Sequence, residues 1–188
     1  MLLDALRDFE WLNEPREFAF NERGLKITAS SQTDFWQDGI GGYNKDNGHF
    51  FFANKQGAYT VTVHWRCGIP KNFAQCGLMG RINEKFWFKI SLFSKSGQNM
   101  NIGSVVTNDG NSDMALSPIL STEQEIFFRV KKSENGIFEL SYSQNGISFV
   151  SVRRFRLNAV DKNIDVGAFI CSPSEEPYTA VLISVDFS

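Results

Sequence analysis

The sequence predicts an all-β protein, a two-sheet antiparallel β-sandwich of the jelly-roll kind. About a dozen short segments alternate apolar and polar residues at intervals of about ten residues, and no segment reads as a convincing helix. Aromatic residues make up 14% of the chain, with eighteen phenylalanines, and flat rings pack well on a pleated sheet. Asn-Gly pairs at 135–136 and 145–146 favour tight hairpin turns. Together these features are typical of a sandwich.

The first expected strand pair covers residues 18–20 and 25–29, which are separated by a polar turn ending in glycine. The segment 30–47 that follows is expected to be a loop, yet it contains the aromatic pair Phe35 and Trp36. We expect these rings to plug the end of the core. A binding role is the alternative, because long loops often carry function.

The clearest alternation covers residues 59–66, after a short apolar strand at 48–53. Tyr59, Val61, Val63 and Trp65 are expected on one face, and Thr60, Thr62, His64 and Arg66 on the other. The first set is apolar and the second is polar. This strand therefore has one face on the core and one in solvent.

Residues 75–82 and 85–93 are expected to form the central hairpin, since only two residues separate them. The apolar face combines Cys76, Leu78, Ile82, Phe86, Phe88, Ile90 and Leu92. The opposite face combines Gln75, Arg81, Trp87 and Lys89. An amide, a guanidinium group, an indole and an ammonium group then lie side by side, and this face is the first place to look for function.

The remaining chain continues the β pattern. Further strands are expected at 102–107, 125–131, 137–143, 147–155, 165–171 and 179–187. A polar loop is expected at 108–113. Without any linker or internal repeat, we expect a single jelly-roll domain over residues 1–188.

Composition excludes several classes of partner and compartment. The net charge is −2, which argues against nucleic acid and membrane partners because both require a basic field. A membrane-spanning helix needs about 20 consecutive apolar residues, and no stretch of the sequence comes near that length. Residues 1–10 are too acidic for a signal peptide. The three cysteines are odd in number and widely spaced, which suits reduced thiols. We therefore expect a cytoplasmic location.

The sequence contains no motif for a cofactor, a metal ion or a catalytic nucleophile. There is no phosphate-binding glycine loop and no nucleophile elbow. His64, Cys67 and Cys76 do not match the spacing of a zinc site. No strand places two carboxylates on one face, as a glycoside hydrolase requires. We therefore expect no cofactor and no metal.

A binding site is easier to argue. Sugar recognition combines a flat aromatic ring with planar polar groups that bond hydroxyls. We assign His64 and Arg129 to the same polar face as Trp87. The alternative is that outer loops cover Trp87 and that nearby acids pair with Arg81 and Lys89.

Several short motifs, in this order, resemble those of the "regulation of enolase" family. They are Thr33-Asp-Phe-Trp36, Asp46-Asn-Gly-His-Phe50, Gln75-Cys-Gly-Leu-Met79 with Arg81, Trp87 with Lys89, Ser104-Val-Val-Thr-Asn108, Ser112-Asp113, and Arg129. The resemblance implies a concanavalin A-like lectin/glucanase jelly roll with Gln75, Arg81, Trp87 and Lys89 on its concave face. It adds Asp34, Trp36, Asn108 and Asp113 to the candidate ligand-binding residues.

The chain departs from the family pattern at three positions. Ala74 and Phe93 stand where the family has acids, and Met114 stands where it has tryptophan. Arg81 and Lys89 are then expected to lack their acidic partners, which favours an anionic ligand.

The leading functional hypothesis is a non-catalytic lectin-like protein that binds a carbohydrate or a small polar or anionic metabolite in the concave groove. One alternative is a carbohydrate-active enzyme whose acids come from loops, such as Asp34 and Asp113. The other is a protein-interaction module, for instance a homodimer joined by sheet faces or edges.

Overall fold

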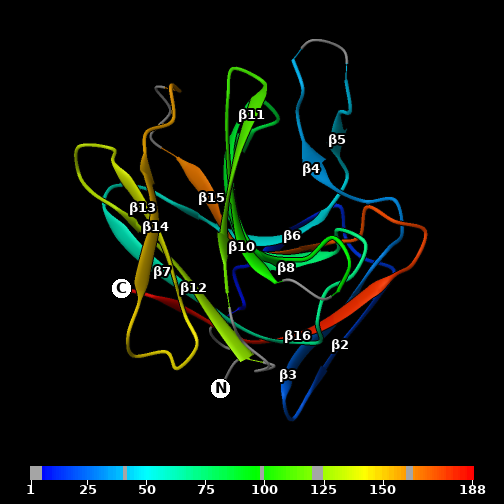
Figure 1. The fold of residues 1–188 in the computed structure, drawn as a ribbon. Helices are drawn as coiled ribbons and strands as arrows, with labels where there is room; N and C mark the ends of the chain where they lie inside the picture. Colours follow the sequence, from blue (N-terminus) through cyan, green and yellow to red (C-terminus); the bar gives the residue numbers. More distant parts are fainter. Residues whose placement is uncertain (1–5, 40–41, 98–99, 120–124, 160–162) are drawn as a thin grey trace.

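The computed structural model describes residues 6–39, 42–97, 100–119, 125–159 and 163–188, and all regular structure in these ranges is β-strand (Figure 1). Of residues 1–10, which were predicted not to be a signal peptide, the first five lie outside the described residues. Two antiparallel sheets of seven strands each form a sandwich. The predicted all-β, concanavalin A-like jelly roll is confirmed.

Sheet A carries the face on which function was predicted. Its strands, in spatial order, are β1 (Glu10–Leu12), β6 (His49–Lys55), β15 (Ile164–Cys171), β8 (Gln75–Asn83), β9 (Phe86–Phe93), β10 (Asn101–Asn108) and β11 (Asn111–Pro118). In Figure 1 the sheet curves from the upright β10 and β11 to β6 and β8 below. The short hairpin of β4 (Phe35–Trp36) and β5 (Lys45–Asp46) stands on the concave side of this curve.

Sheet B forms the other layer. Its strands, in spatial order, are β14 (Val150–Phe155), β13 (Phe138–Ser143), β12 (Glu125–Lys132), β7 (Tyr59–Cys67), β16 (Tyr178–Phe187), β3 (Gly24–Ala29) and β2 (Glu17–Asn21). β7 and β8 follow one another in the chain but belong to different sheets. Their polar faces therefore point in opposite directions.

The main core lies between the sheets and follows the predicted alternation. Val63 and Trp65 of β7 are fully buried, as is Phe88 of β9. The Phe88 ring lies 5.0 Å from that of Phe138 and 5.2 Å from that of Phe155, both on sheet B. Burial of each such side chain contributes about 1.5–3 kcal/mol. The apolar face predicted for the central hairpin is thus the sandwich interior.

A second apolar cluster occupies the concave face of sheet A. It consists of Phe35, Phe50, Met79, Trp87, Val105, Phe169 and Cys171. Phe35 is fully buried over this face, with its ring 6.4 Å from that of Trp87. The prediction that Phe35 and Trp36 plug the end of the core is corrected, because both residues pack on the concave face of sheet A and not at an end of the core between the sheets.

Some strands were not predicted. The loop predicted at 108–113 is wrong, because only Asp109 and Gly110, at φ of 54° and 76°, form a turn there, and residues 111–113 begin the strand β11. Positive φ at both central positions is the geometry of a two-residue hairpin turn. β1, β4 and β5 have only two or three residues each, which is too short for alternation to be recognised.

Candidate functional site

The concave face of sheet A carries a pocket of about 380 Å³ beside the 30–47 segment. Its described lining residues are Asp34, Trp36, Tyr43, Phe73, Gln75, Lys89, Phe93, Val105, Met114 and Pro173. The strands from β8 to β11 provide the floor, and the segments that flank them provide the walls. We call this the concave pocket.

The floor of the concave pocket is hollow because small residues meet there on three neighbouring strands. Gly77 of β8 pairs with Ser91 of β9, and Ser91 pairs with Gly103 of β10. A Cβ added at Gly103 would lie 3.2 Å from Met114 Cε and 3.5 Å from Phe93 Cβ. A larger side chain at Gly103 would therefore occupy the pocket.

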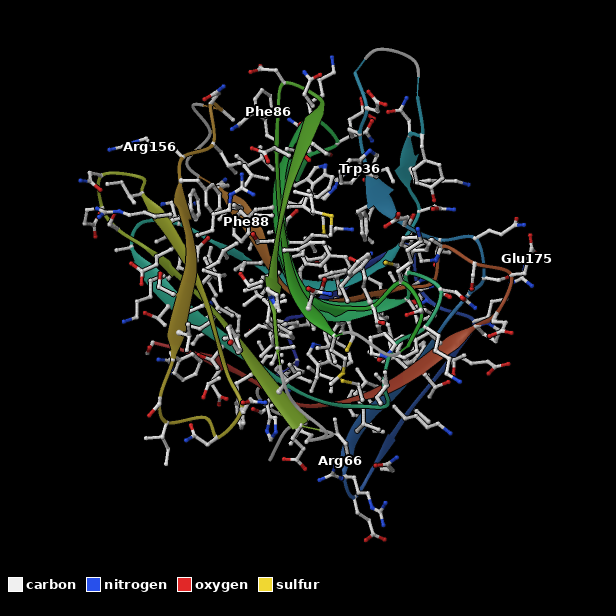
Figure 2. All side chains as sticks on the ribbon, viewed as in Figure 1. Trp36, Arg66, Phe86, Phe88, Arg156 and Glu175 are labelled. Carbon is white, nitrogen blue, oxygen red and sulfur yellow. The ribbon has the colours of Figure 1, made fainter. Side chains whose placement is uncertain are left out.

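Four aromatic side chains form its walls and rim. Tyr43 and Phe73 are 46% and 42% exposed and stand at the mouth, whereas Phe93 is 9% exposed and lies inside. The rings of Phe73 and Phe93 are 5.7 Å apart. Figure 2 shows Trp36 on the concave side of sheet A and Phe88 on its interior side. The aromatic walls thus lie on the concave face of sheet A and not in the core between the sheets.

A buried ion pair lies in the pocket wall. Lys89 Nζ donates to Asp34 Oδ1 at 3.2 Å and to the Phe35 carbonyl at 2.8 Å. Lys89 is 2% exposed and Asp34 is 8% exposed. Asp34 Oδ1 also accepts the Phe35 N–H at 2.8 Å and the Cys171 thiol at 3.6 Å. These bonds compensate both charges and hold the 30–47 segment on the sheet.

Two further groups complete the polar lining. Gln75 Oε1 accepts a bond from Ser91 Oγ at 3.2 Å, and its Nε2 donates to the Phe73 carbonyl at 3.2 Å. Burial raises the pKa of Tyr43 to about 12, and the Asp34 carboxylate acts in the same direction. The Tyr43 hydroxyl therefore remains protonated near neutral pH and is able to donate a hydrogen bond.

Four of the ten predicted site residues meet in the concave pocket: Asp34, Trp36, Gln75 and Lys89. Trp87 lies on the predicted face but is fully buried, and its Nε1 donates to the Glu84 carbonyl at 3.1 Å. The expectation that Trp87 contacts the ligand is therefore corrected. It supports the site from beneath Phe35.

The expectation that Arg81 and Lys89 lack acidic partners is wrong. Arg81 Nη2 donates to Asp46 Oδ2 at 2.6 Å, and Lys89 is paired with Asp34. Both acids come from the 30–47 segment, not from the strand positions 74 and 93. The alternative prediction, in which outer loops cover Trp87 and acids pair with both cations, describes the structure.

His64 and Arg129 lie on the outer face of sheet B. His64 Nε2 is 3.0 Å from Glu125 Oε2, and the Arg129 guanidinium lies 3.5 Å from the centre of the Phe149 ring. The prediction that they share a face with Lys89 is wrong, because β7 and β8 belong to different sheets.

Asn108 and Asp113 do not line the concave pocket either. Asn108 Oδ1 accepts the Asn158 N–H at 2.8 Å, and Asp113 forms an ion pair of 2.9 Å with Arg153 of β14. Asp113 thus connects the edge strand β11 to sheet B, and Asn108 connects β10 to the segment that follows β14.

Residues that sequence reasoning missed include Tyr43, Phe73, Val105 and Met114. Tyr43 carried the same signal as Trp36, an aromatic side chain inside a polar loop. Phe93 and Met114 were noticed only as departures from the family pattern, although both line the pocket. No local pattern could place Phe73, because its position depends on how its loop folds.

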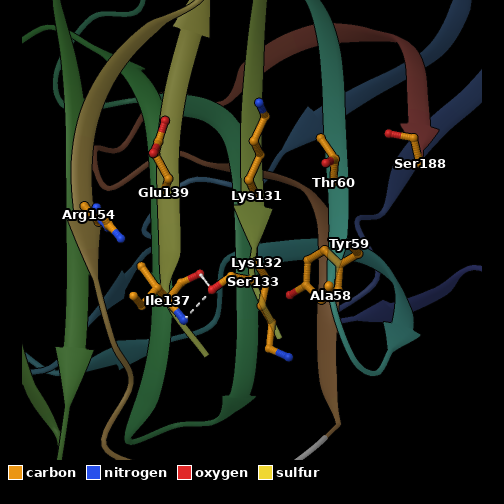
Figure 3. Close-up of a pocket in the computed structure, with 10 residues that line it drawn as sticks. All are labelled: Ala58, Tyr59, Thr60, Lys131, Lys132, Ser133, Ile137, Glu139, Arg154 and Ser188. Carbon is orange, nitrogen blue, oxygen red and sulfur yellow. Dashed lines mark hydrogen bonds between the residues drawn. The ribbon is translucent and has the colours of Figure 1, made fainter. Parts of the chain in front are cut away.

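A different depression, of about 410 Å³, lies at one end of sheet B (Figure 3). Lys131, Glu139 and Arg154 face one another across β12, β13 and β14 there. Lys131 and Arg154 are exposed, whereas the charges of the concave pocket are buried and bonded. The concave pocket is therefore the better candidate for a pre-formed ligand site.

Two absences hold for the described ranges of the chain. Within those ranges no helix is long and apolar enough to cross a membrane. Within the same ranges, no three His, Cys, Asp or Glu side chains are grouped as a metal ion would require.

Solved structures share this fold. A functionally unknown protein from Saccharomyces cerevisiae has a TM-score of 0.88 at 22% identity, over 97% of both chains. The xylan beta-1,4-xylosidase from Bacillus halodurans C-125 has a TM-score of 0.71 at 13% identity, over 96% of this chain and 39% of that one. A GH43 protein from Bacillus licheniformis has a TM-score of 0.76 at 13% identity, over 96% of this chain and 36% of that one. At these identities the likeness establishes the fold alone.

Sequence comparison establishes the family. "Regulation of enolase protein 1" of Saccharomyces cerevisiae is 29% identical over 164 residues, which are 87% of this chain and 80% of that protein. The predicted resemblance is confirmed. The family described as "Protein of unknown function (DUF1349)" matches residues 11–188. The chain therefore belongs to the DUF1349 family.

Proposed function

We propose that the protein is a non-catalytic, lectin-like binding protein that holds a carbohydrate or a similarly polar small molecule in the concave pocket. One observation carries this proposal. Exposed and half-buried aromatic rings stand over a polar lining of buried, hydrogen-bonded side chains within a single pocket of about 380 Å³. Small-molecule sites combine apolar walls with a few placed polar groups in this way.

The unused hydrogen-bonding capacity of the lining suits hydroxyl groups. Asp34 Oδ1 is fully engaged, but its Oδ2 has no hydrogen bond to the other described residues. Gln75 Nε2 uses one of its two hydrogens on the Phe73 carbonyl. An acceptor and a donor therefore remain for a ligand hydroxyl, while Trp36 and Tyr43 offer faces for the C–H side of a sugar ring.

The backbone of Phe73 also supports a binding role. Its φ of 68° lies in the left-handed region, which is unfavourable for a bulky residue. Strain of this kind gathers at ligand-binding sites, where the surrounding structure holds it. Phe73 stands at the mouth of the pocket, so its ring position bears directly on ligand entry.

The charge arrangement favours a neutral ligand over an anion. Strong recognition of an anionic ligand commonly uses an Arg or Lys side chain that is free to pair with it. Lys89 and Arg81 are each paired with an aspartate of the 30–47 segment. The anionic metabolite of the original hypothesis therefore has less support than a neutral sugar.

Binding is better supported than hydrolysis. Glycoside hydrolysis requires two carboxylates on opposite sides of the scissile bond. Asp34 is the only carboxylate among the described residues that line the pocket. Asp113, the other acid of the enzyme hypothesis, is bonded to Arg153 outside the pocket.

We propose a cytoplasmic location for the protein, supported by three cysteines that are all free and buried.

A glycan array followed by calorimetric titration of free sugars tests the proposal. Trp36→Ala removes an aromatic wall, and we expect it to weaken binding at least about tenfold, or about 1.4 kcal/mol. Phe18→Ala is the matched control, because Phe18 is 39% exposed on β2, away from the concave pocket. No binding on the array and in the titrations, or equal affinity for Trp36→Ala and the native protein, contradicts the proposal.

A further inference from the structure

The two ends of the concave pocket differ. Cross-strand register places Trp87, Thr107 and Ser112 in one row across β9, β10 and β11. Lys89, Val105 and Met114, which line the pocket, form the row two residues away on the same face. The row that contains Trp87 therefore lies directly beyond one end of the pocket.

Main-chain and side-chain hydrogen bonds close that end. The Gln37 N–H donates to Ser112 Oγ at 2.9 Å, and the Ser112 N–H donates to the Gln37 carbonyl at 2.8 Å. Thr107 Oγ1 lies 2.7 Å from Ser112 Oγ. The chain leaving β4 is thus joined to the edge strand β11, and we call this contact the Gln37–Ser112 bridge.

The other arm of the hairpin is fixed on the opposite side of the same row. Arg81 of β8 bonds Asp46 of β5 at 2.6 Å. Phe35 packs on Trp87 between the two anchors, and both rings are fully buried. Among the residues that the structure describes, the β4–β5 hairpin therefore spans the concave face from β8 to β11 and covers Trp87.

The opposite end is the mouth. Gln75 and Phe93 pair with each other at the far ends of β8 and β9. Phe73, whose carbonyl accepts a hydrogen bond from Gln75 and whose ring lies 5.7 Å from that of Phe93, is 42% exposed at this end. In the described part of the chain, the concave pocket is therefore closed at the Trp87 end and exposed at the Phe73 end, unlike a groove that is open at both ends.

We propose that the concave pocket holds one terminal residue of a saccharide, or a free monosaccharide, and excludes internal residues of a chain. This inference rests on the proposed carbohydrate-binding function. An internal residue needs an exit for the chain on both sides, and the Gln37–Ser112 bridge removes one of them. The volume of about 380 Å³ lies near the lower limit of the about 300–1,000 Å³ of small-molecule sites, which suits a single ring with its hydroxyls.

A glycan array in which saccharides are attached through their reducing ends gives the first test. The probes form two sets of pairs. In the first set, both saccharides have the same terminal residue but different internal residues. In the second set, both have the same internal residues but different terminal residues. We expect signals to follow the terminal residue, with at least about tenfold weaker binding when it is changed. Signals that follow the interior repeat overturn the inference but leave the proposed function standing, whereas no signal on the array or with free monosaccharides removes both.

A variant that opens the bridge gives the second test. Ser112→Pro removes both the N–H and the Oγ that Gln37 uses, and proline is tolerated on an edge strand where the N–H points away from the sheet. Ser112→Ala is the control, because it keeps the N–H. Terminal selectivity is the ratio of array signals between probes that differ only in their terminal residue. We expect this ratio to fall to within about twofold for Ser112→Pro and to stay at about tenfold or more for Ser112→Ala. Unchanged selectivity in a folded Ser112→Pro protein, checked by its thermal melt, overturns the role of the bridge.

Discussion

The Asp34–Lys89 ion pair allows the electrostatics of the pocket to be tested without knowledge of the ligand. Lys89 is 2% exposed, and its Nζ lies 3.2 Å from Asp34 Oδ1. Lys89→Met preserves most of the length of the side chain and removes its charge. The Asp34 carboxylate then remains nearly buried without a cation.

The magnitude follows from the burial of each partner. Removal of one member of a buried pair costs about 3–5 kcal/mol, because the other charge is left uncompensated. The Asp34 side chain is 11% exposed and keeps its bond from the Phe35 N–H, so we expect a loss near 3 kcal/mol. In a domain of this size that corresponds to a fall of about 6–12 °C in Tm. Asp34→Asn, which leaves Lys89 unpaired, should cost a similar amount.

The double variant Asp34→Asn/Lys89→Met separates pairing from simple loss of contacts. It leaves no buried charge, so its cost should be lower than the sum of the single costs by about 1.5 kcal/mol or more. Urea denaturation of the four proteins measures these values. Lys85→Met, in an exposed turn, is the control and should stay within about 0.5 kcal/mol of the native protein. Single losses below about 1 kcal/mol, or additive losses, would refute the reasoning.

Three further outcomes follow from the structure. Trp87→Ala should lower the free energy of unfolding by about 3–5 kcal/mol, whereas Trp36→Ala, at the half-buried pocket wall, should cost less; chemical denaturation compares them. Gly77→Ala should cost about 3 kcal/mol or more, because the added Cβ would lie 2.0 Å from a carbonyl oxygen of β9. Gly103→Ala should fold normally, because its added Cβ would lie 3.2 Å or more from its nearest neighbours, which are all side-chain atoms; thermal melts distinguish the two variants. Burial lowers the pKa of His49, and its Nε2 accepts a backbone N–H at 3.0 Å. The contribution of neutral His49 to stability should therefore be fully present above about pH 6.5 and be lost as the pH falls from there through the lowered pKa of the folded state. Thermal melts as a function of pH should show this loss in the native protein and not in His49→Gln.

The face assignment of individual strands could be predicted from sequence because it is local. Alternation with a period of two residues placed Val63 in the core and Lys89 on the opposite face of its own strand. Both placements are confirmed, because Val63 belongs to the core between the sheets and Lys89 lines the concave pocket. The relation between two strands is not local, however. Whether the polar faces of β7 and β8 coincide depends on which sheet each joins, and no alternation pattern contains that information. This is why His64 was grouped with Lys89 although the two lie on different sheets.

The position of the 30–47 segment could not be predicted for a related reason. Its composition indicated a loop, and its aromatic pair indicated contact with the body of the protein. Which surface it contacts is decided by long-range bonds, such as that from Lys89 to Asp34 across 55 positions in the chain. Trp87 illustrates the consequence, since its face was predicted correctly, whereas its burial agrees with the alternative prediction and not with its proposed contact to a ligand.

The departures from the family pattern acquire a different meaning once these contacts are known. The absence of acids at Ala74 and Phe93 suggested bare cations and an anionic ligand. Instead, the 30–47 segment supplies the acids, so the departures change the walls of the pocket and leave its charge balanced. Phe93 and Met114 contribute apolar surface beside Gly103, where a larger residue would close the space. The same departures that argue against cleavage chemistry are therefore consistent with the proposed pocket for one sugar ring.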